Sequence, residues 1–292
     1  MELNNPMPKY NLFGVENPEY SEAQVVVLPV PYDSTTTYKS GARDGPHEII
    51  SASRNMETYS EEFGCDITEK IRIFTTDELA PNLNSPEETV RSIEEEVSKI
   101  LKDGKMPVLL GGEHTVAVGA IYAVSKHMKD FSVIHFDAHS DYRDEYMGSK
   151  YCHACIMARA RERCDSCFSV GVRSIDETSA TKYGKDILYR KDMHNMTIKE
   201  VSEEIIRRTR KNVYITIDTD VIDPSQLPST GTPEPDGLSF FELTQILKSV
   251  ISEKHLVGID FNELAPIGGL TAPNYLVAKL VYMALGYAFI KN

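Results

Sequence analysis

The feature that most limits the fold of this 292-residue chain is a regular alternation between short apolar, β-branched runs and longer amphipathic stretches. Several short runs are apolar at every position, as expected for strands that helices cover on both faces. Strand–helix alternation of this kind predicts an α/β fold of three layers (α/β/α) around a mostly parallel sheet. About eight strands are predicted, at residues 23–29, 71–74, 107–110, 132–137, 167–171, 187–189, 213–218 and 256–260.

Helix start signals lie between these runs. Ser85 precedes Pro86 and stands three residues before Glu88, which combines an N-cap, a proline at the first helical position and a capping-box glutamate. Ser239 and Glu242 repeat the capping box. Further helices are expected to begin near His47, Thr115, Cys152, Thr197 and Pro273. No linker or internal repeat interrupts the pattern, so residues 1–292 are expected to form a single domain.

Charge and hydropathy bear on the partners of the chain. The formal charge of −13 at pH 7 would repel nucleic acid and favours cationic ligands, although a solvated acidic surface also explains it. Residues 1–10 are polar and lack the basic start and apolar stretch of a secretory signal. The longest apolar run, residues 280–290, is too short to span a bilayer. We therefore expect no nucleic acid, no membrane and a cytoplasmic location.

Ionisable residues follow four of the predicted strands. In open parallel sheets, ligands bind outside the carboxyl ends of the strands, so these residues are expected to meet at one edge. They are His114 after the third strand, Asp137, His139 and Asp141 after the fourth, Asp218 and Asp220 after the seventh, and Glu263 after the eighth.

The spacing of these residues predicts a metal site. In extended backbone, residues two apart point to the same face, so Asp137, His139 and Asp141 can converge, and so can Asp218 and Asp220. With the histidine after the third strand they make four carboxylates and two imidazoles. Such carboxylates repel one another unless cations intervene, and two divalent ions about 3.5 Å apart would resolve the conflict. The oxygen-rich, thiol-free set favours Mn²⁺ over structural zinc. Either motif alone could be a solvated turn.

The sequence as a whole resembles the ureohydrolase family of arginase and agmatinase, and agmatinase most of all. The resemblance covers nearly the whole chain and implies an arginase-like fold. It rests on Gly111-Gly112-Glu113-His114, Asp137-Ala138-His139-Ser140-Asp141, residues 217–224 with 231–235, and Asn262-Glu263-Leu264-Ala265-Pro266. Asp236 stands where the family commonly has glycine.

The resemblance implies two Mn²⁺ ions per subunit with a hydroxide between them that attacks the guanidinium carbon. It implies that Asp137 and Asp218 bridge the ions. The first ion would be held by His114, Asp137, Asp141 and Asp218, and the second by Asp137, His139, Asp218 and Asp220.

Similarity to the family also implies the catalytic roles. Asp141 would carry a proton to the departing amine, and His153 would shuttle protons at the mouth of the site. Glu263 would pair with the planar guanidinium. Thr232 either hydrogen-bonds Glu263 beside the substrate or simply shapes a turn. The family also forms oligomers, so a homotrimer or homohexamer is expected.

The expected substrate is agmatine, a small guanidino cation that the enzyme would cleave to putrescine and urea in polyamine biosynthesis. Residues 142–152 should lie over the substrate tail and lack the Asn and Ser pattern by which arginases recognise an amino acid. Asp144 and Glu145 could hold the ammonium end of agmatine, or they belong to a solvated loop. Arginine or another guanidino acid is the alternative substrate.

Two other classes of protein are less well supported. A deacetylase-like amide hydrolase would hold one zinc ion and need fewer Asp ligands than this chain offers. A non-catalytic metal-binding protein would not need both His153 and Glu263, and the chain has both.

The cysteines form a separate pattern. Cys152 and Cys155 are three residues apart, as are Cys164 and Cys167. They could be ordinary reduced, packed cysteines, or they could form disulfides with a redox role, since the first pair brackets His153. A structural zinc is the least favoured interpretation because the gap between the pairs is shorter than in zinc ribbons.

Overall fold

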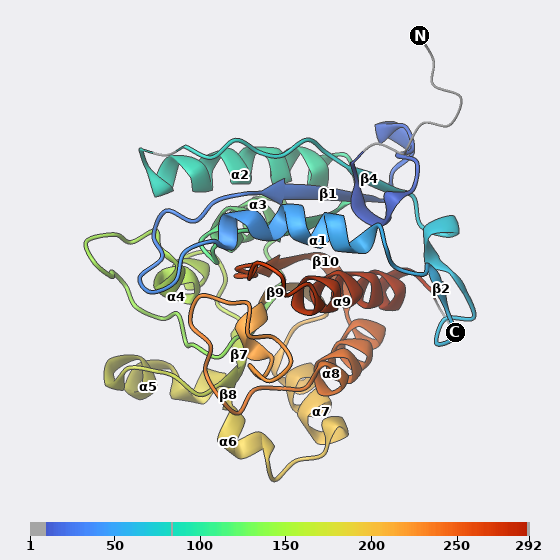
Figure 1. Ribbon diagram of the computed structural model, residues 1–292. Helices are drawn as coiled ribbons and strands as arrows, with labels where there is room; N and C mark the ends of the chain where they lie inside the picture. The colour runs from blue at the N-terminus through green and yellow to red at the C-terminus, as the bar shows by residue number, and fades with distance from the viewer. Residues whose placement is uncertain (1–9, 83, 291–292) are drawn as a thin grey trace.

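The computed structural model describes residues 10–82 and 84–290, so residues 1–9, which carry most of the expectation about a secretory signal, lie outside the described residues. Eight strands form one sheet through the centre of the molecule (Figure 1). All eight strands predicted from the sequence are present, with ends within two residues of the expected ones. They are β1 (Val25–Val30), β4 (Ile73–Thr75), β5 (Met106–Gly111), β6 (Ser132–Phe136), β7 (Cys167–Val172), β8 (Ile187–Tyr189), β9 (Asn212–Asp218) and β10 (His255–Asn262).

Every strand pairing in this sheet is parallel, and the spatial order is β4-β1-β5-β10-β9-β6-β7-β8. The sheet is therefore fully parallel, slightly more regular than the mostly parallel sheet that the sequence predicts. A separate antiparallel ribbon joins β2 (Tyr59–Ser60) and β3 (Cys65–Asp66).

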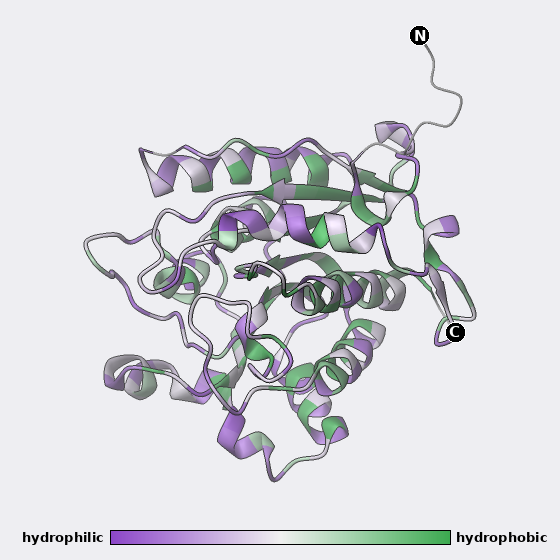
Figure 2. Cartoon of the chain, in the orientation of Figure 1, coloured by the Kyte–Doolittle hydropathy of each residue, from purple (hydrophilic) through white to green (hydrophobic). Residues whose placement is uncertain are grey.

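Helices cover both faces of the sheet, which confirms the three-layer α/β/α arrangement. One face packs against α2 (Pro86–Lys102), α3 (Val116–His127) and α4 (Ile156–Arg161). The other packs against α1 (Gly45–Ser53), α7 (Ile198–Arg208), α8 (Phe240–Glu253) and α9 (Ala272–Phe289). The strands are mainly apolar, whereas α2 and α8 alternate apolar and polar residues (Figure 2). Burial on both faces explains why the strands read as continuous apolar runs.

Both predicted N-caps form, but only the second closes a capping box, because the Glu88 side chain pairs with Arg91. The Ser85 side chain accepts a hydrogen bond from the Glu88 amide at 3.2 Å, and Ser239 with Glu242 forms a complete capping box. Each cap satisfies amides that the first helical turn leaves unpaired. Two short helices, α5 (Glu177–Tyr183) and α6 (Arg190–Met193), were not predicted because neither is long enough to show a helical period.

The strand order places the candidate site. The four strands that precede the ionisable residues, β5, β10, β9 and β6, are neighbours in the sheet. Because all the strands are parallel, their carboxyl ends form one continuous edge. Two strands from the end of the chain, β9 and β10, lie between β5 and β6, and such a change in strand order opens a crevice at this edge. Among residues 10–82 and 84–290, no helix is long and apolar enough to cross a membrane.

Candidate metal centre

One histidine faces three carboxylates at the carboxyl edge of the sheet. His114 follows β5, and its Nδ1 lies 3.2 Å from Asp137 Oδ2. The same nitrogen lies 3.5 Å from Asp141 Oδ2 and 3.5 Å from Asp218 Oδ2. All four residues are buried. The chain thus brings together one nitrogen and three oxygens that come from three different strand ends.

A second histidine forms an adjoining group. His139 Nδ1 lies 2.9 Å from Asp220 Oδ2 and 3.5 Å from Asp137 Oδ1. Asp137 therefore turns one oxygen toward His114 and the other toward His139, which joins the two groups. The ligand atoms of Asp137, His139 and Asp220 lie within 4.8 Å of one another, and so do those of His114, His135, Asp137 and Asp141. Each group is compact enough for one cation.

The proton on His114 can be placed from its other partners. Asp260 is buried and accepts hydrogen bonds from Tyr214 Oη at 2.6 Å, from Thr216 Oγ1 at 2.6 Å, and from the Asn262 amide. Since the Thr216 hydroxyl donates to Asp260, it accepts at its contact with His114 Nε2, 2.8 Å away. His114 therefore carries its proton on Nε2.

This tautomer leaves a lone pair on His114 Nδ1. That atom is buried and has no hydrogen-bond partner among the described residues. Burial alone would lower the pKa of His114, but Asp137, Asp141 and Asp218 raise it well above its usual value, so without a metal ion this lone pair takes up a second proton. A divalent cation at this point would satisfy the nitrogen and the oxygens together, so the residues fit a metal ion.

His135, a buried residue of β6, lies against the candidate centre. Its Nε2 lies 2.8 Å from Asp137 Oδ2, and its Nδ1 lies 3.0 Å from Ser169 Oγ. The two-residue spacing of His135 and Asp137 puts both side chains on one face of the strand. This spacing is the sequence signal from which the contact could have been predicted. His135 holds the carboxylate that joins the two groups.

The acidic and basic groups perturb one another strongly. Burial, followed by the charges of Asp220 and Asp137, raises the pKa of Asp218 well above its usual value. Burial alone would lower the pKa of His139, but Asp220 and Asp137 outweigh it and raise this pKa to about 12. Without a cation, therefore, the cluster holds protons to limit its negative charge.

Glu263 lies beside this cluster in a constrained backbone conformation. Its φ is +66°, in the left-handed region, and its amide donates to Gly112 O at 2.7 Å. Its Oε1 accepts from the His114 amide at 2.7 Å. Burial, followed by the charge of Glu113, raises the pKa of Glu263 to about 8. A Cβ on Gly112, whose carbonyl accepts from the Glu263 amide, would lie 2.0 Å from the Tyr32 carbonyl oxygen, so only glycine fits at this position.

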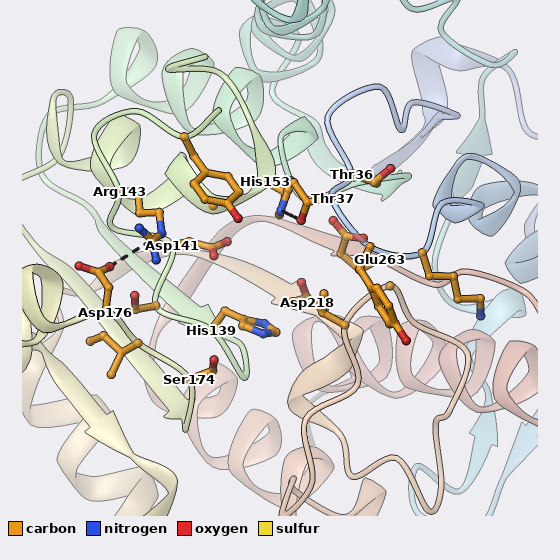
Figure 3. Close-up of a pocket in the computed structure, with 18 residues that line it drawn as sticks. Thr36, Thr37, His139, Asp141, Arg143, His153, Ser174, Asp176, Asp218 and Glu263 are labelled. Carbon is orange, nitrogen blue, oxygen red and sulfur yellow. Dashed lines mark hydrogen bonds and ion pairs between the residues drawn. The ribbon is translucent and has the colours of Figure 1, made fainter. Parts of the chain in front are cut away.

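A cavity of about 320 Å³ opens over the cluster (Figure 3). Its lining includes Asp141, His153, Thr232 and Glu263, four of the residues expected to act in catalysis or substrate binding. His153 lies 3.5 Å from the hydroxyls of Thr35 and Thr37 through its two ring nitrogens. The Thr232 hydroxyl contacts Asp220 at 3.5 Å, whereas the sequence left open a contact with Glu263 or a turn-shaping role.

The acidic residues over the cavity differ from those expected. Asp144 and Glu145 are exposed and lie outside the cavity lining, and Asp144 pairs with Arg159. Asp176, which sequence reasoning missed, lines the cavity instead. Its oxygens accept from the Ser179 amide at 3.0 Å and the Ser179 hydroxyl at 2.7 Å, so it caps α5. The side of a loop that faces a cavity depends on distant partners such as Arg159, which local spacing does not reveal.

Comparison with known proteins gives a consistent result. The model of the arginase family matches residues 23–286. An N(1)-aminopropylagmatine ureohydrolase of Thermus thermophilus is 39% identical over 278 residues, 94% of each chain. An agmatinase of Pyrococcus horikoshii is 31% identical and covers 95% of this chain and 97% of its own. The crystal structure of an agmatine ureohydrolase of Thermoplasma volcanium superposes with a TM-score of 0.86 at 32% identity, over 93% and 92% of the two chains.

Proposed function

This chain belongs to the arginase family, and we propose that it binds two Mn²⁺ ions and hydrolyses agmatine to putrescine and urea. The observation that carries the proposal is the pair of His/Asp groups that share Asp137. The first ion would be held by His114, Asp137, Asp141 and Asp218, and the second by Asp137, His139, Asp218 and Asp220. When bound, such ions lower the pKa of water toward neutrality and so supply a nucleophile.

The chain's own residues would orient the guanidinium group. Glu263 lines the cavity, and the His114 amide holds its Oε1. This leaves Oε2 to accept hydrogen bonds from the guanidinium group, and a planar cation suits a carboxylate. The backbone at Glu263 is left-handed, and the His114 amide holds the side chain beside the end of β5. Glu263 would thus fix the carbon to be attacked relative to the metal ligands.

Two further residues would move protons. Burial, followed by the charge of Asp137, raises the pKa of Asp141, which favours a carboxyl group that can take up a proton and pass it to the departing amine. Burial lowers the pKa of His153, so its ring is neutral near neutral pH and can accept a proton at the cavity wall. Thr35 and Thr37 position that ring.

The cavity favours a substrate that ends in an amine. Asp176 and Glu263 lie on opposite sides of the view in Figure 3, with His139 and Asp141 between them. Asp176 lies 3.9 Å from Arg143 Nε, a loose contact that leaves the carboxylate able to attract an ammonium group. Asp176 would thus hold the ammonium group, a role for which Asp144 and Glu145 were one of two sequence interpretations.

A longer guanidino amine is the second candidate substrate. Several relatives, including those of Thermus thermophilus and Synechocystis, are named N(1)-aminopropylagmatine ureohydrolases. An aminopropyl extension adds a second cationic group, which the acidic side of the cavity could also accommodate. The carboxylate of arginine would meet both Asp176, which repels it, and Arg143, which attracts it, so the preference for the amines also rests on the named relatives.

The test measures urea released from agmatine, N(1)-aminopropylagmatine, arginine and guanidinobutyrate. The protein is first stripped of metal with a chelator and then assayed with and without Mn²⁺. We expect Mn²⁺-dependent release, with the two amines far ahead of the two acids. Urea released from arginine alone would contradict agmatine as the substrate. No urea from any of the four compounds would contradict the proposed activity.

A further inference from the structure

Two buried thiols lie in contact beside the cavity. Cys152 and Cys155 are 2% and 0% exposed, and their Sγ atoms are 3.3 Å apart. The Cys155 amide donates to the Cys152 carbonyl at 3.0 Å, so the two residues close a single turn. Such a turn brings its end Cα atoms within 7 Å, a separation that a disulfide spans. A bond would need the sulfurs to approach only to about 2.05 Å.

The two residues between these cysteines form part of the cavity wall. His153 and Ala154 both line the cavity, and Figure 3 labels His153 among the side chains that face it. The His153 amide donates to Thr35 Oγ1 at 3.3 Å, in addition to the ring contacts with Thr35 and Thr37. Any shift of the Cys152–Cys155 turn therefore moves a residue that contacts the substrate space.

The other cysteine pair provides a contrast. The Cys164 thiol donates to the carbonyls of Phe131 at 3.2 Å and Ser166 at 3.3 Å, and the Cys167 thiol donates to the Cys164 carbonyl at 3.4 Å. None of the four cysteines lines the cavity, but only the first pair brackets residues that do, His153 and Ala154. Among the described residues, the groups that could hold a metal contain no cysteine. Contact with Cys167 also lowers the pKa of Cys164, to about 7, so the second pair is a control dithiol that brackets no cavity residue.

We propose that Cys152 and Cys155 are a redox-active dithiol, which hydrogen peroxide oxidises to a disulfide that displaces His153 and slows turnover. The Cys152 thiolate attacks one peroxide oxygen, which leaves a sulfenic acid on Cys152 and releases one water. The Cys155 sulfur then attacks Cys152 and releases a second water. Two electrons pass from the sulfurs to the peroxide, and both thiol protons end in water.

The chemistry of the pair is consistent with this order of attack. Contact with the Cys155 thiol lowers the pKa of Cys152, because a thiolate there gains a hydrogen bond. The thiolate is the reactive form, so Cys152 is the sulfur that meets the oxidant. The slower turnover rests on the proposed function, whereas the formation of the disulfide does not. A displacement of about 1 Å in an active site can cost up to ~10²-fold in rate.

The experiment treats the metal-loaded protein with hydrogen peroxide, alkylates the remaining thiols and maps the peptides by mass spectrometry. We expect one disulfide between Cys152 and Cys155, unmodified Cys164 and Cys167, and full reversal by dithiothreitol. Free Cys152 and Cys155 after treatment, or a disulfide at Cys164–Cys167 instead, would overturn the proposal. This peptide map shows whether Cys152 and Cys155 form a disulfide even if the protein releases no urea.

The activity is then compared before and after oxidation. We expect kcat to fall by about tenfold or more in the wild type and to recover on reduction, with the metal content unchanged. C155S and C152S should keep their activity in peroxide, which excludes damage to the metal ions, and C164S should respond as the wild type does. A mapped disulfide with unchanged kcat would overturn the regulatory half of the proposal.

Discussion

Replacing Thr216 with valine tests how the chain orients its metal-binding histidine. Valine has nearly the shape of threonine but lacks the hydroxyl that joins His114 Nε2 to Asp260. The substitution leaves the buried His114 N–H without an acceptor and removes one of the three donors to Asp260. An unsatisfied buried group costs about 1–3 kcal/mol, and a hydrogen bond to a charged group contributes about 1.5–3 kcal/mol. The free energy of unfolding of the metal-free protein should fall by about 2.5–6 kcal/mol.

The same substitution should weaken metal binding. Without its acceptor, the His114 ring is free to carry its proton on Nδ1, the atom that faces Asp137, Asp141 and Asp218. Loss of such a supporting contact typically lowers metal affinity ~10- to 100-fold. Calorimetric titration of the chelator-treated protein with Mn²⁺ measures this change, and urea unfolding followed by circular dichroism measures the stability.

The control is Thr216→Ser, which keeps the hydroxyl and loses only a methyl group. It should bind Mn²⁺ as tightly as the wild type and lose about 1 kcal/mol of stability. A folded Thr216→Val protein with wild-type Mn²⁺ affinity would refute the assigned tautomer of His114. Equal losses of affinity in the serine and valine variants would refute it too.

Three further predictions concern substrate binding and protonation. Glu263→Gln should keep its metal content, measured by elemental analysis, but lose ~10²- to 10³-fold in kcat/KM because an orienting charge is gone; release of metal would show a structural role instead. Asp176→Asn keeps a capping side chain, so KM for agmatine should rise about tenfold, equivalent to ~1.4 kcal/mol, while kcat changes little; an unchanged KM would remove Asp176 from the substrate site. The metal-free protein should lose stability as pH rises. In the folded protein the pKa of Glu263 is about 8, against a usual 4.5, and that of His139 is about 12, against 6.5. Between these two values each group binds a proton in the folded state that it lacks in the unfolded state. The stability that this proton confers is lost as the pH rises from the unfolded pKa to the folded one. Urea midpoints measured across this range should therefore decline, and a rising series would contradict the assignment.

The sequence predicts the sheet well because each strand is buried on both faces and reads as an apolar run. Start signals such as Ser85 and Ser239 are equally local, so their helices are found. The insertion of β9 and β10 between β5 and β6 depends on packing between distant segments and has no local signal. The convergence of the four strand ends was still predictable, since parallel strands end at a common edge.

For the candidate site, the metal-binding groups were predicted better than the substrate contacts. The groups around His114 and His139 lie close together as the two-residue spacing predicts. Asp144 had two predicted roles, a substrate contact or a solvated loop residue, and it is exposed and pairs with Arg159. Asp176 was missed because it also caps a helix. Asp236 has a φ of +64°, a conformation that glycine adopts without strain, which fits the glycine that the family resemblance implies at this position.

The most direct test of the account is a crystal grown with Mn²⁺ and measured for anomalous scattering at the manganese edge. We predict two peaks about 3.5 Å apart, one beside His114 Nδ1 and one beside His139 Nδ1, with Asp137 and Asp218 between them. A single peak, or two peaks away from these histidines, would contradict the claim that the clustered carboxylates exist to hold a pair of cations.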